Sequence, residues 1–371
     1  MIVFDKVSKT YPDGTVAVGE LSLEAPNGKI TVLVGPSGCG KTTSMRMINR
    51  LIDPTSGSIT IDGEDTSSID KVELRRKIGY VIQNAGLFPH RTVVDNVGAL
   101  PRLLGGKKKQ TRDRAMELLE LVGLESSLAG KYPWQLSGGQ QQRVGVARAL
   151  ATDPPFLLMD EPFSAVDPIV RAQLQQEFLR LQDSIGKTIV LVTHDVDEAL
   201  VLGDQIAVLR QGGHLAQIAS PAGLLRNPAG KFVADFVGRS RGYRSLGFTT
   251  ADEQLSIRDT PSAQIGTPAG ELPSRPDGWL VAVDAQQRPL GWVHHDEVEG
   301  QLQESHINHA GSAASSSAPL RDFLDAALSS PAGDGIVTDP AGAFLGVART
   351  EDVVAAIGRA KNASPGSRAR A

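Results

Sequence analysis

The sequence contains a single cysteine, Cys39, among its 371 residues, so no disulfide can form within the chain. This suits a reducing compartment such as the cytosol. No apolar run approaches the roughly 20 residues that a membrane-spanning helix needs. The first ten residues, MIVFDKVSKT, carry charge within five positions and have no long apolar core, unlike a signal peptide. If the protein takes part in transport, we expect other chains to form the membrane path.

The net charge is also small, and the charged residues are divided unevenly along the chain. The net charge is −4, which gives no reason to expect nucleic acid as a partner. Residues 1–240 carry 27 basic and 26 acidic side chains, whereas residues 241–371 carry 11 and 16. The length alone favours two or three domains. We therefore expect a nearly neutral first domain and an acidic second one.

Short apolar runs alternate with helical patterns in the first two thirds of the chain. The first run, Ile30–Val34, is followed by a glycine-rich turn and a helical pattern over Lys41–Leu51. Helical periodicity then extends over residues 92–151. Three more apolar runs follow at Phe156–Met159, Thr188–Val192 and Gln205–Leu209. Buried runs that alternate with helices predict an α/β fold with a largely parallel sheet.

The glycine-rich turn matches a phosphate-binding loop and lies between a buried strand and a helix, as that motif requires. It consists of Gly35, Pro36, Ser37, Gly38, Cys39, Gly40, Lys41, Thr42 and Thr43. Such a loop points backbone N–H groups at one anion and adds the positive N-terminus of the helix. Lys41 can reach the terminal phosphates, and the hydroxyl of Thr42 suits Mg²⁺. Because Cys39 lies at a helix N-terminus, where thiol pKa values tend to fall, we expect alkylation there to block ATP binding and Mg-ATP to protect it.

A second chemical feature is the acidic end of the apolar strand FLLMDE. Asp160 is placed to hold Mg²⁺, and Glu161 can act as a general base toward an attacking water. A third is Ser137-Gly138-Gly139-Gln140, which opens a helix over Gln141–Ala151. Taken alone, Ser137 could simply cap that helix.

Together with these features, the segment LSGGQQQRVGVARAL resembles the signature motif of ATP-binding-cassette (ABC) ATPases, and the resemblance covers about residues 1–238. It implies a P-loop NTPase cassette with a RecA-like core and a helical subdomain. It implies that Tyr11 stacks on adenine, that Ser164–Asp167 is the D-loop and that Asp167 contacts nucleotide. The implied catalytic residues are Lys41, Gln83, Glu161 and His194, and the implied Mg²⁺ ligands are Thr42, Gln83 and Asp160. Two cassettes would pair head to tail, so that Ser137 and Gly138, Gly139 and Gln140 face the ATP held by the partner cassette.

Three segments are similar in sequence to the ATPases of importers of glycine betaine, carnitine, choline and proline. They are RMINRLIDPTSGSITIDG, IGYVIQNAGLFPHRTVVDNV and YPWQLSGGQQQRVGVARALA. This resemblance implies an ATP- and Mg²⁺-dependent subunit at the cytoplasmic face of the cell membrane. Its partners would be a separate integral-membrane permease and, indirectly, an extracytoplasmic substrate-binding protein. Importers of polyamine or methionine remain alternatives. A soluble ABC-type ATPase of DNA repair or translation is a further one, although those usually carry two cassettes or a long coiled coil.

Beyond Gly238 the composition changes. Residues 239–264 are rich in Ser, Gly, Thr and Pro and are predicted to be a linker. Two similar units follow, Trp279–Val298 and Gly335–Val354, separated by the serine-rich GSAASSSAP. They resemble a pair of CBS domains, which predicts a smaller α+β tandem domain over residues 265–360 and a basic flexible tail over 361–371.

The ribose-contacting positions of CBS domains fall on His294 and Glu297 in the first unit and on Arg349 and Asp352 in the second. Neither unit has the usual hydroxyl there. A regulatory ligand site and a purely packing or dimerising role therefore both stay open for this domain.

Overall fold

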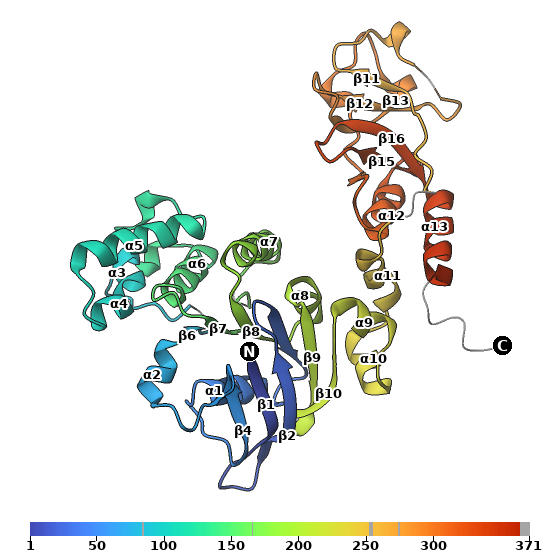
Figure 1. Cartoon of the computed structure of the whole chain (residues 1–371). Coiled ribbons are helices and arrows are strands. Elements are labelled where there is room, and N and C mark those ends of the chain that lie inside the picture. Colours follow the sequence, from blue (N-terminus) through green and yellow to red (C-terminus); the bar gives the residue numbers. More distant parts are fainter. Residues whose placement is uncertain (84, 165, 252–254, 274, 364–371) are drawn as a thin grey trace, which may run out of the picture. The chain divides into compact units, whose positions relative to one another are not determined.

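The computed structural model describes residues 1–363, apart from residues 84, 165, 252–254 and 274. Most of the expected basic tail therefore lies outside the described residues, as does Ala165 of the expected D-loop. The chain divides into two compact units, Met1–Gly238 and Arg239–Ala371 (Figure 1). Within the described part, none of the helices combines the length and apolar character needed to span a membrane.

The first unit contains two sheets. The smaller is antiparallel, has the strand order β2-β1-β4-β5 and consists of β1 (Ile2–Thr10), β2 (Val16–Ala25), β4 (Ser56–Ile61) and β5 (Glu64–Asp65). Much of β2 alternates between buried and exposed residues, as expected for a strand with one face on the core. Its buried face packs against the second sheet in one apolar cluster that includes Phe4, Leu21 and Leu33.

The larger sheet has the order β10-β9-β3-β8-β7-β6. Its strands are β3 (Ile30–Val34), β6 (Ile78–Val81), β7 (Phe156–Asp160), β8 (Thr188–Thr193), β9 (Gln205–Arg210) and β10 (His214–Ala219). All neighbours are parallel except β10, which pairs antiparallel with β9. Every residue of β3, β7 and β8 is buried, which explains why these strands are unbroken apolar runs in the sequence. The predicted α/β architecture with a largely parallel sheet is confirmed.

Helices pack beside this sheet. Four of the helices, α3 to α6, form a separate group at one side of the unit (Figure 1). The helices are α1 (Lys41–Ile48), α2 (Lys71–Arg76), α3 (Val93–Val97), α4 (Ala99–Leu103), α5 (Lys108–Leu121), α6 (Gly138–Ala149), α7 (Pro168–Ile185), α8 (Val196–Leu202), α9 (Pro221–Arg226) and α10 (Lys231–Val237). Short 3₁₀ turns lie at Ser126–Leu128, Pro133–Gln135 and Gln211–Gly213. The helix α6 begins three residues earlier than expected because Ser137 caps it.

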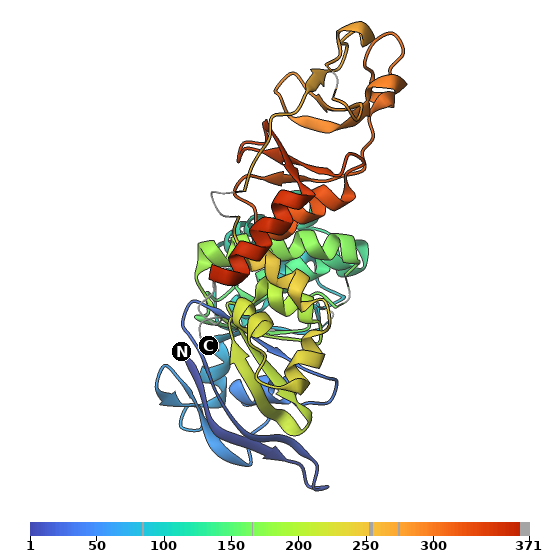
Figure 2. The same ribbon diagram turned by 90° about the vertical axis from the view of Figure 1, so that its right-hand side faces the viewer.

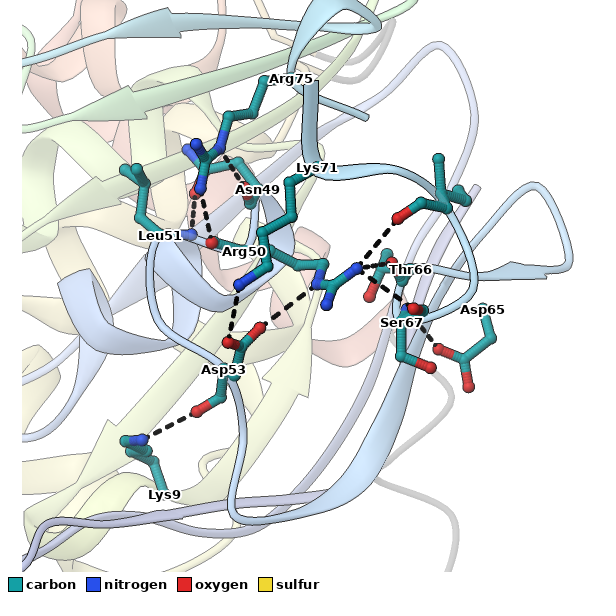
Figure 3. A network of polar contacts seen from close by, with 11 residues as sticks. Lys9, Asn49, Arg50, Leu51, Asp53, Asp65, Thr66, Ser67, Lys71 and Arg75 are labelled. Carbon is teal, nitrogen blue, oxygen red and sulfur yellow. Dashed lines mark hydrogen bonds and ion pairs between the residues drawn. The ribbon is translucent and has the colours of Figure 1, made fainter. Parts of the chain in front are cut away.

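The helix after the phosphate-binding loop ends at Ile48, not at Leu51 as expected, because Arg50 has a left-handed backbone with φ 51°. Its guanidinium Nη1 donates to the carbonyls of Thr66, Ser67 and Ile69 at 2.9–3.2 Å. Asp53 accepts from Arg50 and from Lys71 (Figure 3). These contacts fasten the C-terminal end of α1 to the turn after β5.

The second unit contains two three-stranded sheets with the same register. Their strands are β11 (Ser262–Gln264), β12 (Trp279–Val283) and β13 (Pro289–His294), then β14 (Ala313–Ser315), β15 (Asp334–Thr338) and β16 (Phe344–Arg349). In each sheet the first strand is parallel to the second and the third is antiparallel. Gly291 pairs with Ala282 and Gly346 with Val337, so the two glycines occupy equivalent places.

The two repeats differ in their helices. The second repeat contains α12 (Leu320–Ser329) and α13 (Thr350–Ala363), which pack side by side through Leu320, Leu324 and Ala356 (Figure 2). In the corresponding places of the first repeat, the described residues form only short 3₁₀ turns, Ala269–Glu271 and His295–Glu297. Asp296, Glu297 and Val298 of the first repeat therefore do not continue into a helix.

Two segments that were expected to be irregular contain regular elements. The expected linker 239–264 contains α11 (Arg241–Ser245), a turn at Leu246–Phe248 and β11, and the serine-rich spacer contains β14. Leu246 is buried in the same apolar cluster as Leu320 and Ala356. The two strands are three residues long and are held by backbone pairing to β12 and β15, so they need no apolar pattern of their own.

Candidate nucleotide and hydrolysis site

Four parallel strands of the larger sheet place the expected site residues at one edge. The phosphate-binding loop follows β3, Gln83 follows β6, Asp160 ends β7 and His194 follows β8. Because β3, β8, β7 and β6 are adjacent and parallel, their carboxyl ends lie along the same edge. In open α/β sheets this edge is where ligands bind.

The loop between β3 and α1 needs glycine at two positions for lack of space. A Cβ on Gly35 would lie 2.3 Å from the carbonyl oxygen of Leu209, and one on Gly40 would lie 2.2 Å from that of Ala17. Gly40 also has φ 93°, a left-handed value that favours glycine. Ser37 and Gly38 are exposed at the tip of the loop. The tight backbone leaves room for a ligand at the tip and not beneath it.

Lys41 is the first residue of α1 and is only 7% exposed. Its ammonium donates to the carbonyls of Gly35 at 2.7 Å and Pro36 at 3.0 Å. Among the described side chains, its hydrogen-bond acceptor is the Sγ of Cys39. A buried ammonium whose described hydrogen bonds all go to neutral groups is costly unless an anion can approach it. This environment fits the phosphates of a nucleotide.

Asp160 and Thr42 supply adjacent oxygen atoms beside the lysine. The hydroxyl of Thr42 donates to Oδ1 of Asp160 at 3.1 Å. Burial raises the pKa of Asp160, opposed by the hydrogen bond from Thr42 and by the charge of Arg46. A buried carboxylate next to a hydroxyl is a favourable pair of ligands for a hard divalent cation, which would also offset the cost of burying the negative charge. The residues present therefore fit Mg²⁺.

Gln83, Glu161 and His194 come together from three different strand ends. The amide of Gln83 donates to Oε2 of Glu161 at 3.3 Å, and Nδ1 of His194 lies 3.1 Å from Oε1 of the same carboxylate. Glu161 has a left-handed backbone with φ 45°, and its N–H donates to the carbonyl of Val192. This unusual conformation for a glutamate holds the carboxylate at the end of β7, where the other two side chains reach it.

Ser137 and Gln140 form a capping box at the start of α6. The hydroxyl of Ser137 accepts from the N–H of Gln140 at 3.3 Å, and the side chain of Gln140 accepts from the N–H of Ser137 at 3.0 Å. A Cβ on Gly139 would lie 3.2 Å from Leu174 of α7, whereas Gly138 is exposed. Within the described contacts, nothing joins these four residues to the loop around Lys41. Capping and a partner-facing role are compatible, since the other face of Ser137 is open to solvent.

The remaining expected residues lie around this edge without direct contact to Glu161 in the described hydrogen bonds. Tyr11 lies in the turn between β1 and β2, is 36% exposed and has the Lys9 ammonium 5.5 Å from its ring centroid. Thr43 is half-buried in the first turn of α1. Asp167 is exposed just before α7, where its carbonyl accepts from the N–H of Arg171.

The expectation that Cys39 has a lowered pKa is wrong. Its side chain is fully buried and lies beneath Gly35, so burial raises the pKa of the thiol. The nearby charge of Lys41 opposes this effect but does not reverse it. Desolvation outweighs the favourable position at a helix N-terminus.

Two arginines near the site were not predicted from the sequence. Arg46 of α1 lies beside Asp160, and both line a cavity of about 380 Å³ together with Gln83. Its spacing of five residues from Lys41 was the one available hint. Arg171 of α7 donates to the carbonyl of Val166 at 3.0 Å and lies 3.7 Å from Asp195, the neighbour of His194. The latter contact joins segments that only the fold brings together.

A second buried acid of the first unit, besides Asp160, lies behind the histidine. Glu198 of α8 is 6% exposed and its Oε2 accepts from the hydroxyl of Thr193, the residue before His194. Its other oxygen has no hydrogen-bond partner in the described structure. Burial raises the pKa of this carboxyl.

Comparison with known proteins identifies relatives for most of the chain. The osmoprotectant import ATP-binding protein OsmV of Salmonella typhimurium is 49% identical over 286 residues, which cover 76% of this chain and 75% of OsmV. The glycine betaine/carnitine/choline transport ATP-binding protein OpuCA of Bacillus subtilis is 53% identical over 312 residues, covering 83% and 82%. The glycine betaine uptake system ATP-binding protein YehX of Escherichia coli is 44% identical and is covered over 99% of its length, against 80% of this chain.

A solved structure and a family model indicate the same family as these relatives. A dimeric post-hydrolysis state of the ATP-binding cassette MJ0796, bound to ADP and Pi, is 37% identical, with a TM-score of 0.54 over 60% of this chain and 99% of that chain. The family model described as ABC transporter matches residues 18–164. Members of this family hydrolyse ATP to power transport. The chain therefore belongs to the family of ABC transporter ATP-binding proteins, as its motifs predicted.

Proposed function

We propose that this chain hydrolyses ATP to power import of osmoprotectants such as glycine betaine, choline or proline through a separate permease. The observation that carries hydrolysis is the convergence of Gln83 and His194 on the carboxylate of Glu161, at 3.3 and 3.1 Å. The substrate class rests on the relatives, which are 44–53% identical and are named for osmoprotectant, choline, carnitine or glycine betaine transport.

The loop residues hold the nucleotide in this proposal. Backbone N–H groups of residues 37–42 receive the phosphates, and Lys41 turns its ammonium from the carbonyls of Gly35 and Pro36 toward them. Thr42, Asp160 and Gln83 would hold Mg²⁺, which would offset the negative charge of the phosphates. Tyr11 would stack on the adenine ring, since its ring is exposed next to the strand that packs on Gly40.

Glu161 acts as the general base in this scheme. Its carboxylate accepts a proton from the attacking water as that water's oxygen bonds to the terminal phosphorus and the bond to the bridging oxygen breaks. His194 contacts Oε1 of Glu161 and so can fix the orientation of both the carboxylate and the water. Arg171 and Glu198 hold the segment that carries this histidine from behind.

Two copies of the cassette form the working unit in this proposal. Ser137 is exposed at the N-terminus of a 12-residue helix, a position suited to an anion. Since the described contacts of Ser137 stay within its own cap, its phosphate partner would be held by a second copy, with Asp167 and the D-loop at the same interface. The dimeric state named for the MJ0796 cassette supports this arrangement.

The assembly would lie at the cytoplasmic face of the cell membrane, where the chain docks on integral-membrane permease subunits. An extracytoplasmic substrate-binding protein would deliver the solute to that permease. The names of the relatives support an import system with several components.

For the second unit we propose a tandem CBS-like module. Its support is the matched register of the two sheets and the equivalence of Gly291 and Gly346. At the second ribose position, Asp352 Oδ2 already accepts from Nε and Nη2 of Arg258 at 3.1 and 3.0 Å. An acid that is paired within the chain favours the packing role over a ligand site.

Reconstitution into vesicles with its permease tests the function. We expect ATP-driven uptake of labelled glycine betaine that is lost in Glu161→Gln. ATP-driven uptake of a polyamine or methionine instead would reject the substrate assignment and leave the hydrolytic mechanism standing.

Calorimetric titration of the full chain tests the second unit. Lys41→Ala weakens nucleotide binding to the cassette, so that any remaining heat reports on another site. No heat with AMP, ADP or a cyclic dinucleotide supports packing, whereas a stoichiometric signal that persists in Lys41→Ala establishes a regulatory ligand.

A further inference from the structure

The backbone just after Gln83 has an unusual conformation. Ala85 and Gly86 are both left-handed, with φ 57° and 52°. An alanine seldom adopts such a conformation, and it persists only where the surrounding structure holds it. Ala85 is 2% exposed, so its side of the bend is packed against the protein. Contacts from outside the segment must therefore fix this bend.

Arg148, in the last turn of α6, supplies such contacts. Its Nη2 donates to the carbonyl of Ala85 and its Nη1 to that of Gly86, both at 2.7 Å. Two donors of one planar guanidinium on successive carbonyls fix the direction of both peptide units, which a single donor cannot do. Gly145, three residues earlier on the same helix face, allows the close approach, since a Cβ there would lie 3.3 Å from the Cβ of Ala85. The two hydrogen bonds form a clamp between α6 and the bend after Gln83.

A second arginine of α6 offers a comparison. Arg143 also donates to two successive carbonyls, those of Val122 and Gly123. It forms an ion pair with Glu177 at 2.5 Å as well. Arg148 is half-buried, and burial lowers the pKa of its guanidinium with no charged neighbour among the described residues acting on it. Because burying a cation without a counter-ion is unfavourable, the clamp is explained by the segment that it holds and not by charge pairing.

The side chain of Gln83 is not held by packing. It is exposed, and its described hydrogen bond is the one of 3.3 Å to Oε2 of Glu161. The direction of an exposed side chain depends on its backbone, and here the backbone two residues further on is fixed by Arg148. The same helix is capped by Ser137 at its other end and contains 12 residues, a length of about 18 Å. One rigid helix therefore joins Ser137 to the clamp.

We infer that Arg148 is a positioning residue for Gln83. By holding the two carbonyls of the bend, it fixes the approach of the Gln83 amide to Glu161 and to the Mg²⁺ site. The inference rests on the role proposed for Gln83 as a ligand of Mg²⁺. Since α6 is one rigid helix, a displacement of its start at Ser137 by the nucleotide of a second copy would also displace the clamp. Arg148 would thereby link the partner-facing end of α6 to the metal site of its own chain.

Metal-dependent nucleotide binding tests this role in the full chain. Calorimetric titration with the non-hydrolysable analogue AMP-PNP, in EDTA and at rising Mg²⁺, measures two quantities. They are the dissociation constant without metal and the Mg²⁺ concentration at which binding is half-maximally tightened. Arg148→Met should leave the first within about twofold of wild type, because Lys41 and its loop are unchanged. It should raise the second about tenfold, as for the loss of a group that orients a metal ligand.

The matched control is Arg143→Met, which removes an arginine of the same helix that also donates to two carbonyls. It should change neither quantity by more than about twofold. Circular dichroism establishes that each variant is folded. If Arg148→Met does not fold, Arg148→Lys replaces it in every comparison, since it keeps the charge but has a single donor atom.

A double-mutant cycle establishes whether the effect passes through Gln83. When Gln83→Ala is already present, adding Arg148→Met should raise the required Mg²⁺ less than about twofold further. An equal rise in both backgrounds, an equal rise in Arg143→Met, or no rise in Arg148→Met would overturn the inference.

The cycle also separates this inference from the proposed function. If Gln83→Ala alone leaves the Mg²⁺ dependence of binding unchanged, the role proposed for Gln83 is rejected and the positioning role with it. If Gln83→Ala raises the required Mg²⁺ and Arg148→Met does not, only the positioning role is rejected.

Discussion

The two units use similar polar residues in opposite ways. In the first unit, Glu161 and His194 meet at a strand end, and their side chains are 22% and 57% exposed. In the second, Arg275 and Asp334 pair at 2.8 Å with side chains only 15% and 9% exposed. A solvent-facing group can exchange its partner for substrate or water, whereas a buried pair cannot do so without a large desolvation penalty. The comparison indicates that chemistry belongs to the first unit and structural support to the second.

The largest expected effect is on turnover. Glu161→Gln keeps the shape of the side chain and the contact with Gln83, but the amide cannot accept a proton from water. We expect the steady-state ATPase rate to fall at least ~100-fold, the scale of a lost general base, while ATP binding is retained. A coupled ATPase assay and a nucleotide-binding titration measure the two quantities.

The matched control lies in the second unit. Glu304 is exposed in a short turn there, and Glu304→Gln makes the same chemical change. Its ATPase rate should stay within about twofold of wild type, as for an ordinary surface substitution. Equal rates in Glu161→Gln and Glu304→Gln would remove the distinction between the two units.

The buried pair of the second unit predicts a large effect on stability instead. Arg275→Met leaves Asp334 buried without its cation, which typically costs about 3–5 kcal/mol. We expect the thermal transition of the second unit to fall by at least about 10 °C and that of the first unit to stay in place. Differential scanning calorimetry of the full chain resolves this.

Pairing can be separated from packing by a double change. Arg275→Met combined with Asp334→Leu removes both charges, so it should recover much of the lost stability. If the single variant melts like wild type, the pair does not support the second unit as the structure indicates.

The sequence predicted the first unit better than the second, for a physical reason. Lys41, Asp160 and Glu161 each follow or end a fully buried apolar strand, so the chain itself marks both the strand and the polar group at its end. The strands β11 and β14 carry no such mark, because three residues can join a sheet through backbone bonds alone. Contacts that depend on tertiary proximity, such as Arg171 with Asp195, could not be predicted at all.

A smaller effect on stability is expected in the first unit, where a charged side chain holds two segments together. Arg50 lies just after α1, and its guanidinium donates to three carbonyls of the turn after β5 (Figure 3). A lysine ammonium cannot reproduce this geometry from one position. We expect Arg50→Lys to lower the free energy of unfolding of the first unit by about 1–2 kcal/mol. Denaturant unfolding measures it, with the exposed Arg112→Lys as the control.

The buried acid Glu198 predicts a pH-dependent effect. Burial raises its pKa in the folded state, with Asp195 adding to the shift and Arg171 and His194 opposing it. The folded protein then holds the proton more tightly than the unfolded chain, so stability is lost as the pH rises from about 4.5 through the folded pKa. Glu198→Gln removes this dependence. It should match wild type near pH 4 and exceed it at pH 8 by on the order of 1 kcal/mol. A difference that shrinks as the pH rises would contradict the sign.

The smallest expected effect concerns the reactivity of Cys39. Its position in the sequence predicts a reactive thiol, whereas its burial in the structure predicts an unreactive one. The start of a helix favours a reactive thiolate, but this side chain is fully buried and its pKa is raised by that burial. We expect iodoacetamide to alkylate it at least about tenfold more slowly than a small-molecule thiol at pH 8, with full reactivity restored in denaturant. Protection by Mg-ATP should then be slight, because the folded loop already excludes the reagent. Rapid labelling that Mg-ATP suppresses would instead show that the phosphate-binding loop opens when no nucleotide is bound, and that Cys39 then becomes accessible to solvent.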